Sequence, residues 1–194
     1  MLEEIKMDAE LEKLKTHYAP LVNNIIEGNR KFFDYDNELV CEYVNFTEEK
    51  ERTASYFYEE DIIILNLASI HTIFALNQSK LFEYILLHEF RHKFQTQEMD
   101  AYQRKRQIRV TAEIAESWLK NCRNYIQPLN ENGKENPEYF KQSLEFDANV
   151  YAYAVMQYKY GDVSCLKDCV PGCYGKDFYE KADEWCQRFR EMGI

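Results

Sequence analysis

The sequence predicts an α+β protein that is mostly helical and carries a small three-stranded sheet ahead of a long helix. Three short segments within residues 39–67 are rich in Val, Ile, Tyr and Phe and suit strands, and apolar residues at helical spacing occupy most of the rest. Only six Gly and four Pro interrupt the 194 residues. A chain of this length with 45% hydrophobic residues suits one compact domain with its own core.

Two helices are expected before the sheet. Residues 2–16 place leucine and isoleucine among many charged residues, which is typical of an amphipathic helix. Pro20 suits the first turn of a second helix that reaches about residue 33. The polar residues 34–37 then indicate a turn.

Three strands are expected next, because β-branched and aromatic residues dominate residues 39–46, 54–58 and 62–67. The polar residues 47–52 and 59–61 would connect them. The third segment is the most apolar run in the chain, and we therefore expect a strand that is covered on both faces.

Beyond the sheet the chain is expected to be helical almost to its end. Ser79 is the expected N-cap of the first helix, and Gly161 the residue that stops the third. Val110, Ile114 and Trp118 would give the second helix an apolar stripe. The expected elements are helices over residues 80–97, 103–125, 138–160 and 176–191, a loop over residues 128–137 and an irregular segment over residues 162–175.

The charge balance narrows the classes of partner. The formal net charge is −10, which argues against nucleic acid or an anionic membrane as a partner held by bulk electrostatics. No stretch approaches the roughly 20 apolar residues of a membrane span. The first residues lack the apolar core of a secretory signal, so we expect a cytoplasmic protein. Nothing in the sequence indicates its oligomeric state.

The most informative motif is His88-Glu89-x-x-His92, which lies inside an apolar segment that is expected to be helical. Histidines at i and i+4 lie one turn apart on the same helical face. Two imidazoles so placed can bind one zinc ion, and Glu89 between them can face a water on that ion. The motif therefore predicts a zinc centre with a nearby carboxylate base.

A catalytic zinc usually has three protein ligands, so a third donor is expected downstream. The strongest candidate is Glu145, because Glu145, Ala148, Asn149 and Ala152 share one helical face. The small alanines would let this helix approach the His88–His92 helix while Glu145 reaches the metal.

Other carboxylates remain possible third ligands. Glu113 and Glu116 are nearer to His92 in the sequence. Asp147 points about 200° away from Glu145 around the helix, so these two cannot both face the metal.

The two motifs together resemble a known family. His-Glu-x-x-His followed by Glu145-x-x-Ala148-Asn149-x-x-Ala152 resembles the gluzincin class of zinc metallopeptidases, and the alanine-rich second motif is most similar to the ImmA/IrrE-like proteases of phages and bacterial mobile elements. The order of small sheet and motif helix is also similar to that class. The resemblance covers roughly residues 61–157.

The resemblance implies a site and an activity. It makes His88, His92 and Glu145 the ligands of Zn²⁺ and Glu89 the general base. It also places Asn149 where many gluzincins have an aspartate that orients a ligand histidine. We then expect one zincin-like domain over residues 1–194, consisting of N-terminal helices (residues 1–34), a catalytic core (residues 39–160) and a Cys-containing tail and helix (residues 161–194).

The expected reaction is hydrolysis of peptide bonds by a metal-activated water, on a specific intracellular protein or peptide. Gluzincins often stabilise the oxyanion with a His or Tyr. Tyr151 and Tyr153 are near Glu145 in sequence, but core packing is the favoured explanation for both, and the donor stays unassigned. Arg91 is expected to form a surface salt bridge. The strand over residues 62–67 could offer a free edge to an extended substrate, in which case proline at Ile64 would raise KM.

Six cysteines are also present. Cys41 and Cys122 are expected as isolated core residues. The other four cysteines cluster near the end of the chain, at Cys165, Cys169, Cys173 and Cys186. They could be free thiols that pack the last helix, ligands of a second metal, or a disulfide pair.

Two other functions remain open. One is a metal-binding interaction module of regulatory type that does not hydrolyse its partner. The other is a helical interaction protein in which the His-Glu-x-x-His pattern arose by chance. Substituting Glu89 with Gln separates the enzyme from the module, and substituting His88 with Ala tests the chance motif.

Overall fold

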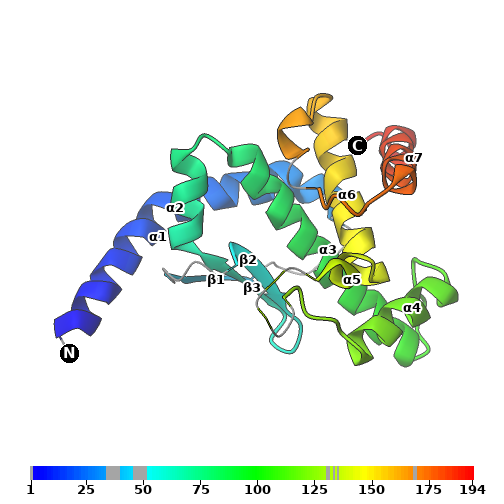
Figure 1. Cartoon of the computed structure of the whole chain (residues 1–194), viewed down its shortest axis with the longest axis horizontal. Helices are drawn as coiled ribbons and strands as arrows, with labels where there is room; N and C mark the ends of the chain where they lie inside the picture. Colours follow the sequence, from blue (N-terminus) through cyan, green and yellow to red (C-terminus); the bar gives the residue numbers. More distant parts are fainter. Residues whose placement is uncertain are drawn as a thin grey trace. The chain divides into compact units, whose positions relative to one another are not determined.

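The computed structural model describes residues 2–33, 40–45, 52–129, 132, 134, 136–167 and 170–194, with side chains from residue 9 onward. The predicted turn at residues 34–37 and most of the connection at residues 47–52 lie outside the described residues. The architecture is α+β and mostly helical, with one three-stranded sheet, as the sequence predicts (Figure 1). Among the described residues, no helix combines the length and the apolar character that a membrane span requires.

The elements follow one another with the sheet between the first and second helices. The α-helices are α1 (Leu2–Asn29), α2 (Leu67–Ala75), α3 (Ser79–Gln103), α4 (Ala112–Arg123), α5 (Pro137–Phe140), α6 (Ser143–Tyr160) and α7 (Lys176–Met192). The strands are β1 (Val40–Val44), β2 (Ala54–Phe57) and β3 (Ile62–Asn66), and short 3-10 turns span Arg30–Phe32 and Ser164–Leu166.

The chain divides into two compact units, Met1–Glu89 and Phe90–Ile194, and the division falls inside α3. In the first unit, the strand order is β1-β3-β2, with β1 parallel and β2 antiparallel to β3. The most apolar strand is therefore central and paired on both sides. The expectation that it offers a free edge to a substrate is wrong, and β2 is the edge strand on that side of β3.

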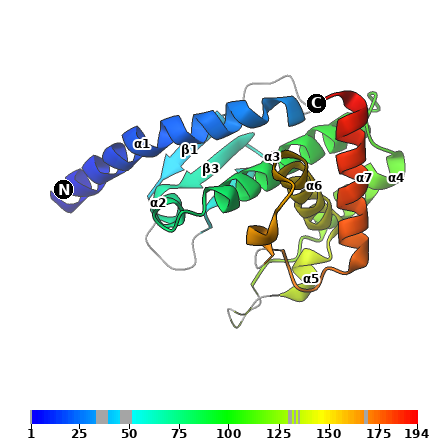
Figure 2. The same cartoon turned by 90° about the horizontal axis from the view of Figure 1, so that it is seen from above.

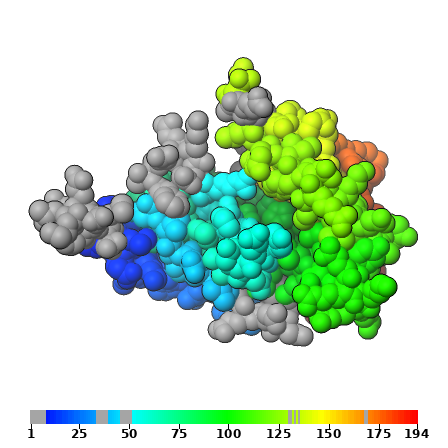
Figure 3. All heavy atoms as spheres, turned by 90° about the horizontal axis from the view of Figure 1, so that it is seen from below, coloured from blue at the N-terminus to red at the C-terminus, as the bar shows by residue number. Residues whose placement is uncertain are grey.

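The two faces of β3 differ in burial. Ile63 and Leu65 are fully buried, whereas Ile62 and Ile64 are only half-buried, so this strand is not covered on both faces as its apolar run suggested. Figures 1 and 3 show the reason, because α1 and α2 lie on one side of the sheet and the opposite face is visible from below. Asn66 ends β3 and caps α2, its side chain accepting a hydrogen bond from the Ala68 amide.

The helices of the first unit differ from the expected ones in two respects. α1 runs through Pro20 without a break, so the two predicted helices are one. A short helix that was not expected, α2, follows the sheet in the sequence and precedes the motif helix α3. It packs on α1, and both helices are labelled in Figure 2. Where they meet, the Tyr18 hydroxyl lies 2.7 Å from His71 Nδ1.

The second unit is built around α6, most of which is buried. α7 packs along α6 through Phe178, Ala182, Cys186 and Phe189, which recur on one face of an otherwise charged helix. α6 ends at Gly161, which adopts a φ of 68° and stops the helix as predicted.

Several other helix boundaries differ from the predicted ones. α3 extends to Gln103 and α4 begins only at Ala112, with the Thr111 side chain as its N-cap. Ala115 and Trp118 face the interior, but Ile114 is exposed, so the expected stripe on α4 is only partly correct. The predicted helix over residues 138–160 is two helices, α5 and α6, because the chain leaves helical geometry at Gln142.

Candidate metal centre

The structure brings three predicted ligands together. His88 and His92 lie one turn apart on the continuous helix α3, and Glu145 lies in the first turn of α6. One ligand atom from each residue lies within 4.8 Å of those of the other two. This is the one such group of His, Cys, Asp and Glu side chains in the described part of the chain. Glu113 and Glu116 are exposed on α4 and do not belong to it.

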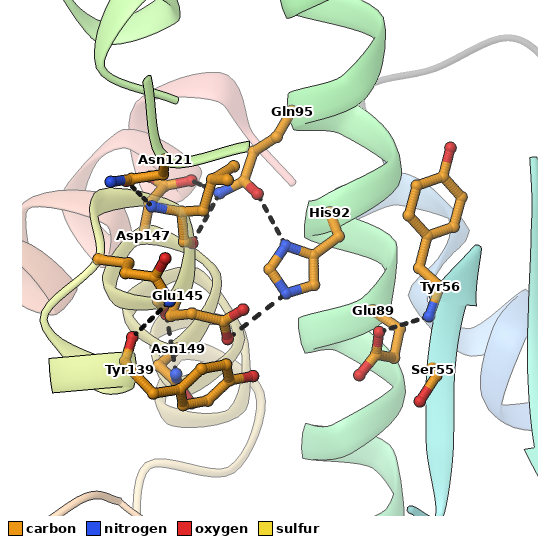
Figure 4. A network of polar contacts seen from close by, with 12 residues as sticks. Ser55, Tyr56, Glu89, His92, Gln95, Asn121, Tyr139, Glu145, Asp147 and Asn149 are labelled. Atoms are coloured by element: carbon orange, nitrogen blue, oxygen red, sulfur yellow. Dashed lines mark hydrogen bonds and ion pairs between the residues drawn. The ribbon is translucent and has the colours of Figure 1, made fainter. Parts of the chain in front are cut away.

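The distance between His92 and Glu145 is close to the spacing of ligand atoms around zinc. His92 Nε2 and Glu145 Oε2 are 3.7 Å apart (Figure 4). Tetrahedral zinc with bonds of about 2.0–2.1 Å places neighbouring ligand atoms about 3.4 Å apart. Two imidazoles and one carboxylate also form a donor set that is known from catalytic zinc sites. The donor types and the spacing of His92 and Glu145 are therefore compatible with a zinc ion.

Two tyrosines lie near the Glu145 side chain, and neither was expected there. The Tyr125 hydroxyl donates a 2.8 Å hydrogen bond to Glu145 Oε1. The Tyr174 hydroxyl accepts a 3.2 Å hydrogen bond from Asn149 Nδ2. Burial raises the pKa of Tyr174 and the charge of Glu145 raises it further, although the Asn149 hydrogen bond acts in the opposite direction. Tyr174 is therefore protonated at neutral pH and can donate a hydrogen bond.

Asn149, which was expected to orient a ligand histidine, is buried on α6. Its Nδ2 also donates a 2.8 Å hydrogen bond to the Glu145 carbonyl, one turn earlier in the helix. The Asn149 side chain thus joins the helix turn that carries Glu145 to the segment that carries Tyr174. Its action on a histidine stays a prediction.

Glu89 is held by a backbone amide. Its Oε2 accepts a 2.8 Å hydrogen bond from the Tyr56 N–H of β2 (Figure 4). The Asn66 N–H donates to the Thr53 carbonyl, and in the alternating antiparallel pattern this makes Tyr56 and Ile63 a non-hydrogen-bonded pair. The Tyr56 N–H consequently faces away from β3, and the edge of the sheet can orient the Glu89 carboxylate.

Arg91 is buried, so the expectation of a surface salt bridge is wrong. Its side chain is 4% exposed, and its Nε and Nη2 donate to Asp147 Oδ2 and Oδ1 at 2.8 and 3.2 Å. The guanidinium carbon lies 4.2 Å from the ring centroid of Phe94 and 4.5 Å from that of Tyr151. Asp147, one of the alternative third ligands, thus engages Arg91.

Tyr151 and Tyr153 make packing contacts with α7. The Tyr151 ring lies 5.0 Å from that of Trp185, and the Tyr153 ring lies 5.4 Å from that of Phe178. These contacts agree with the core-packing explanation of both residues.

The described cysteines form no metal site. Cys165 and Cys173 are exposed, whereas Cys186 is buried and its thiol donates to the Ala154 carbonyl at 3.3 Å. All three are free thiols, and Cys169 lies outside the described residues.

Comparisons with protein-family models, with curated proteins and with solved structures found no match to this chain. The interpretation of the site therefore depends on its geometry and on the two sequence motifs.

Proposed function

We propose that this chain is a zinc-dependent endopeptidase of the gluzincin type that hydrolyses a peptide bond in a specific protein substrate. The observation that carries the proposal is the grouping of His88, His92 and Glu145, whose ligand atoms lie within 4.8 Å of one another. Glu89 supports it, because this carboxylate follows His88 directly and is held by the Tyr56 amide.

His88, His92 and Glu145 would hold the metal through two imidazole nitrogens and one carboxylate oxygen. A zinc ion with three protein ligands lowers the pKa of a water toward about 7 and polarises a carbonyl group. Glu89 would accept the proton of the attacking water and return it to the leaving amine. The hydrogen bond from the Tyr56 N–H keeps Glu89 oriented for this transfer.

A donor is also needed for the oxyanion that develops on the scissile carbonyl. Tyr125 and Tyr174 are the candidates, because the first contacts the Glu145 carboxylate and the second contacts Asn149 one turn further along α6. Tyr151 and Tyr153 are not candidates, because their rings pack against α7.

The first test measures zinc per chain by elemental analysis on protein purified without a metal-affinity tag. We expect about one zinc in the wild type and in His71→Ala, a histidine on α2 outside the group, and none in His88→Ala/His92→Ala. Zinc retained by the double variant would place the metal elsewhere. A wild type that holds no zinc after zinc is added back would contradict the proposal.

The second test separates catalysis from binding. Glu89→Gln should keep its zinc, lose turnover and hold its substrate, so that the variant can capture the substrate from a lysate. The captured protein is then incubated with wild type, and new N-termini are identified by mass spectrometry. We expect cleavage by the wild type only. An intact captured protein would favour a metal-binding interaction module over an enzyme.

A further inference from the structure

Gln95 connects one candidate ligand to the helix that carries another. It lies three residues after His92 on α3 and is completely buried. Its Oε1 lies 2.8 Å from His92 Nδ1, and its Nε2 donates to the Leu144 carbonyl at 3.0 Å and to Asp147 Oδ2 at 2.8 Å (Figure 4). Leu144 immediately precedes Glu145 in the first turn of α6.

The partners of Gln95 decide how its amide is oriented. The Leu144 carbonyl oxygen and the Asp147 carboxylate can only accept hydrogen bonds, and Asp147 is paired with the Arg91 guanidinium through two contacts. The NH₂ group of Gln95 must therefore face them. A flipped amide would bring two acceptor oxygens against its own oxygen in a buried site, which is strongly unfavourable.

The orientation of Gln95 in turn decides the tautomer of His92. The Gln95 oxygen that faces His92 needs a donor, so Nδ1 of the neutral ring carries the hydrogen. Nε2 then has a lone pair, and it is this nitrogen that lies 3.7 Å from Glu145 Oε2. A lone pair that faces a carboxylate oxygen is the arrangement in which a cation between them is favourable.

We infer that Gln95 is a positioning residue that selects the tautomer of His92 in which Nε2 can bind a metal and ties this ring to the turn of α6 that carries Glu145. A single buried amide thereby orients one ligand and holds the helix of another at a matching position. Hydrogen bonds of this kind to ligand histidines strengthen metal binding. The tautomer itself is a property of the metal-free protein, whereas the effect on the metal rests on the proposed function.

The tautomer can be measured directly. We would record ring ¹⁵N NMR spectra of the full-length, metal-free protein at a pH where imidazole is neutral, and assign the four histidines by omission in His→Ala variants. The wild type should carry the hydrogen of His92 on Nδ1, and Gln95→Met should show a mixture of tautomers. Val155→Ala, which removes buried carbon atoms from α6 without touching a polar group, should retain the wild-type signal. A hydrogen on Nε2 in the wild type would overturn the inference even if the Gln95 variant fails to fold.

The consequence for the metal is measured as the zinc Kd by competition with a chelator. We expect Gln95→Met to bind zinc about 10- to 100-fold more weakly. The zinc Kd of Val155→Ala should stay within about threefold of the wild-type value, because this substitution removes packing contacts and no hydrogen bond to a ligand. Equal Kd values and equal tautomers in Gln95→Met and the wild type would refute the positioning role. A wild type without zinc affinity would refute the proposed function, and the NMR result would still decide the tautomer.

Discussion

Arg91 and Asp147 form a pair whose energetic value depends on both partners being present. The Arg91 side chain is 4% exposed and that of Asp147 is 23% exposed, so neither charge is fully compensated by water. Removing one partner of such a pair leaves the other charge poorly solvated, whereas removing both does not. The pair also holds Asp147 where Gln95 contacts it.

We therefore expect Arg91→Met to lower the free energy of unfolding by about 3 kcal/mol. Arg91→Met/Asp147→Leu should lower it less than Arg91→Met alone, because no uncompensated carboxylate remains. Urea denaturation followed by circular dichroism measures both. Arg104→Met, which breaks an exposed pair with Asp100, should cost less than about 1 kcal/mol. A double variant that is less stable than the single one would contradict this account.

Tyr125 offers a second prediction for a single residue. Its hydroxyl donates to the candidate ligand Glu145, and it is 38% exposed, so replacing it should disturb the carboxylate more than the fold. Tyr125→Phe should weaken zinc binding about tenfold, the lower end of the range for partners of metal ligands. Tyr179→Phe, an exposed tyrosine on α7, is the matched control and should leave the zinc Kd unchanged. Equal Kd values for the two variants would separate Tyr125 from the metal centre.

At the level of elements, the strand order predicts that two proline substitutions in the sheet differ in their effect on stability. Ile64 is paired with Glu42 on one side and Ser55 on the other, so proline there removes a ladder hydrogen bond from the central strand. Tyr56 lies on the edge strand with its N–H directed at Glu89, so proline there removes this contact and leaves the β2–β3 ladder in place.

Ile64→Pro should therefore prevent folding of the sheet. Tyr56→Pro should lower the free energy of unfolding by about 1.5–3 kcal/mol, which is the loss of one hydrogen bond to a charged group. Thermal unfolding followed by circular dichroism distinguishes them. Similar losses from both substitutions would mean that the edge and centre of this sheet have been assigned incorrectly.

The sequence predicts elements best where their signal is local. The three strands lie within one or two residues of their predicted bounds, because β-branched and aromatic residues mark each of them. The prediction that a second helix begins at Pro20 was wrong, although proline favours the first turn of a helix. Tyr18 and Val22 are buried, and their packing keeps α1 continuous through Pro20. The parallel pairing of β1 with β3 could not be predicted, because no local pattern encodes which strands become neighbours.

The same distinction applies to the candidate site. His88, Glu89 and His92 share one turn and carry a recognisable spacing, and small residues beside Glu145 marked its helix face. The contact of Tyr125 with Glu145 joins residues 20 positions apart, and that of Gln95 with Asp147 joins residues 52 positions apart. Neither has a motif, and fifteen tyrosines hide the two that lie near Glu145. Residues that support a ligand are therefore found only when the fold is known.

At the scale of the whole molecule, the proposal predicts that zinc and folding are linked. A ligand that binds only the folded chain raises its stability by an amount that grows with the ratio of ligand concentration to Kd. At a free zinc concentration of about 100 times Kd, the gain is about 2.7 kcal/mol, which corresponds to roughly 5–10 °C in Tm for a chain of this size. Thermal unfolding of wild type across a zinc titration should show this rise, and a chelator should reverse it. His88→Ala/His92→Ala should show no rise, because two of the three ligand groups are gone. An equal rise in both proteins would mean that zinc binds elsewhere on the chain, since only binding at this group requires those two imidazoles.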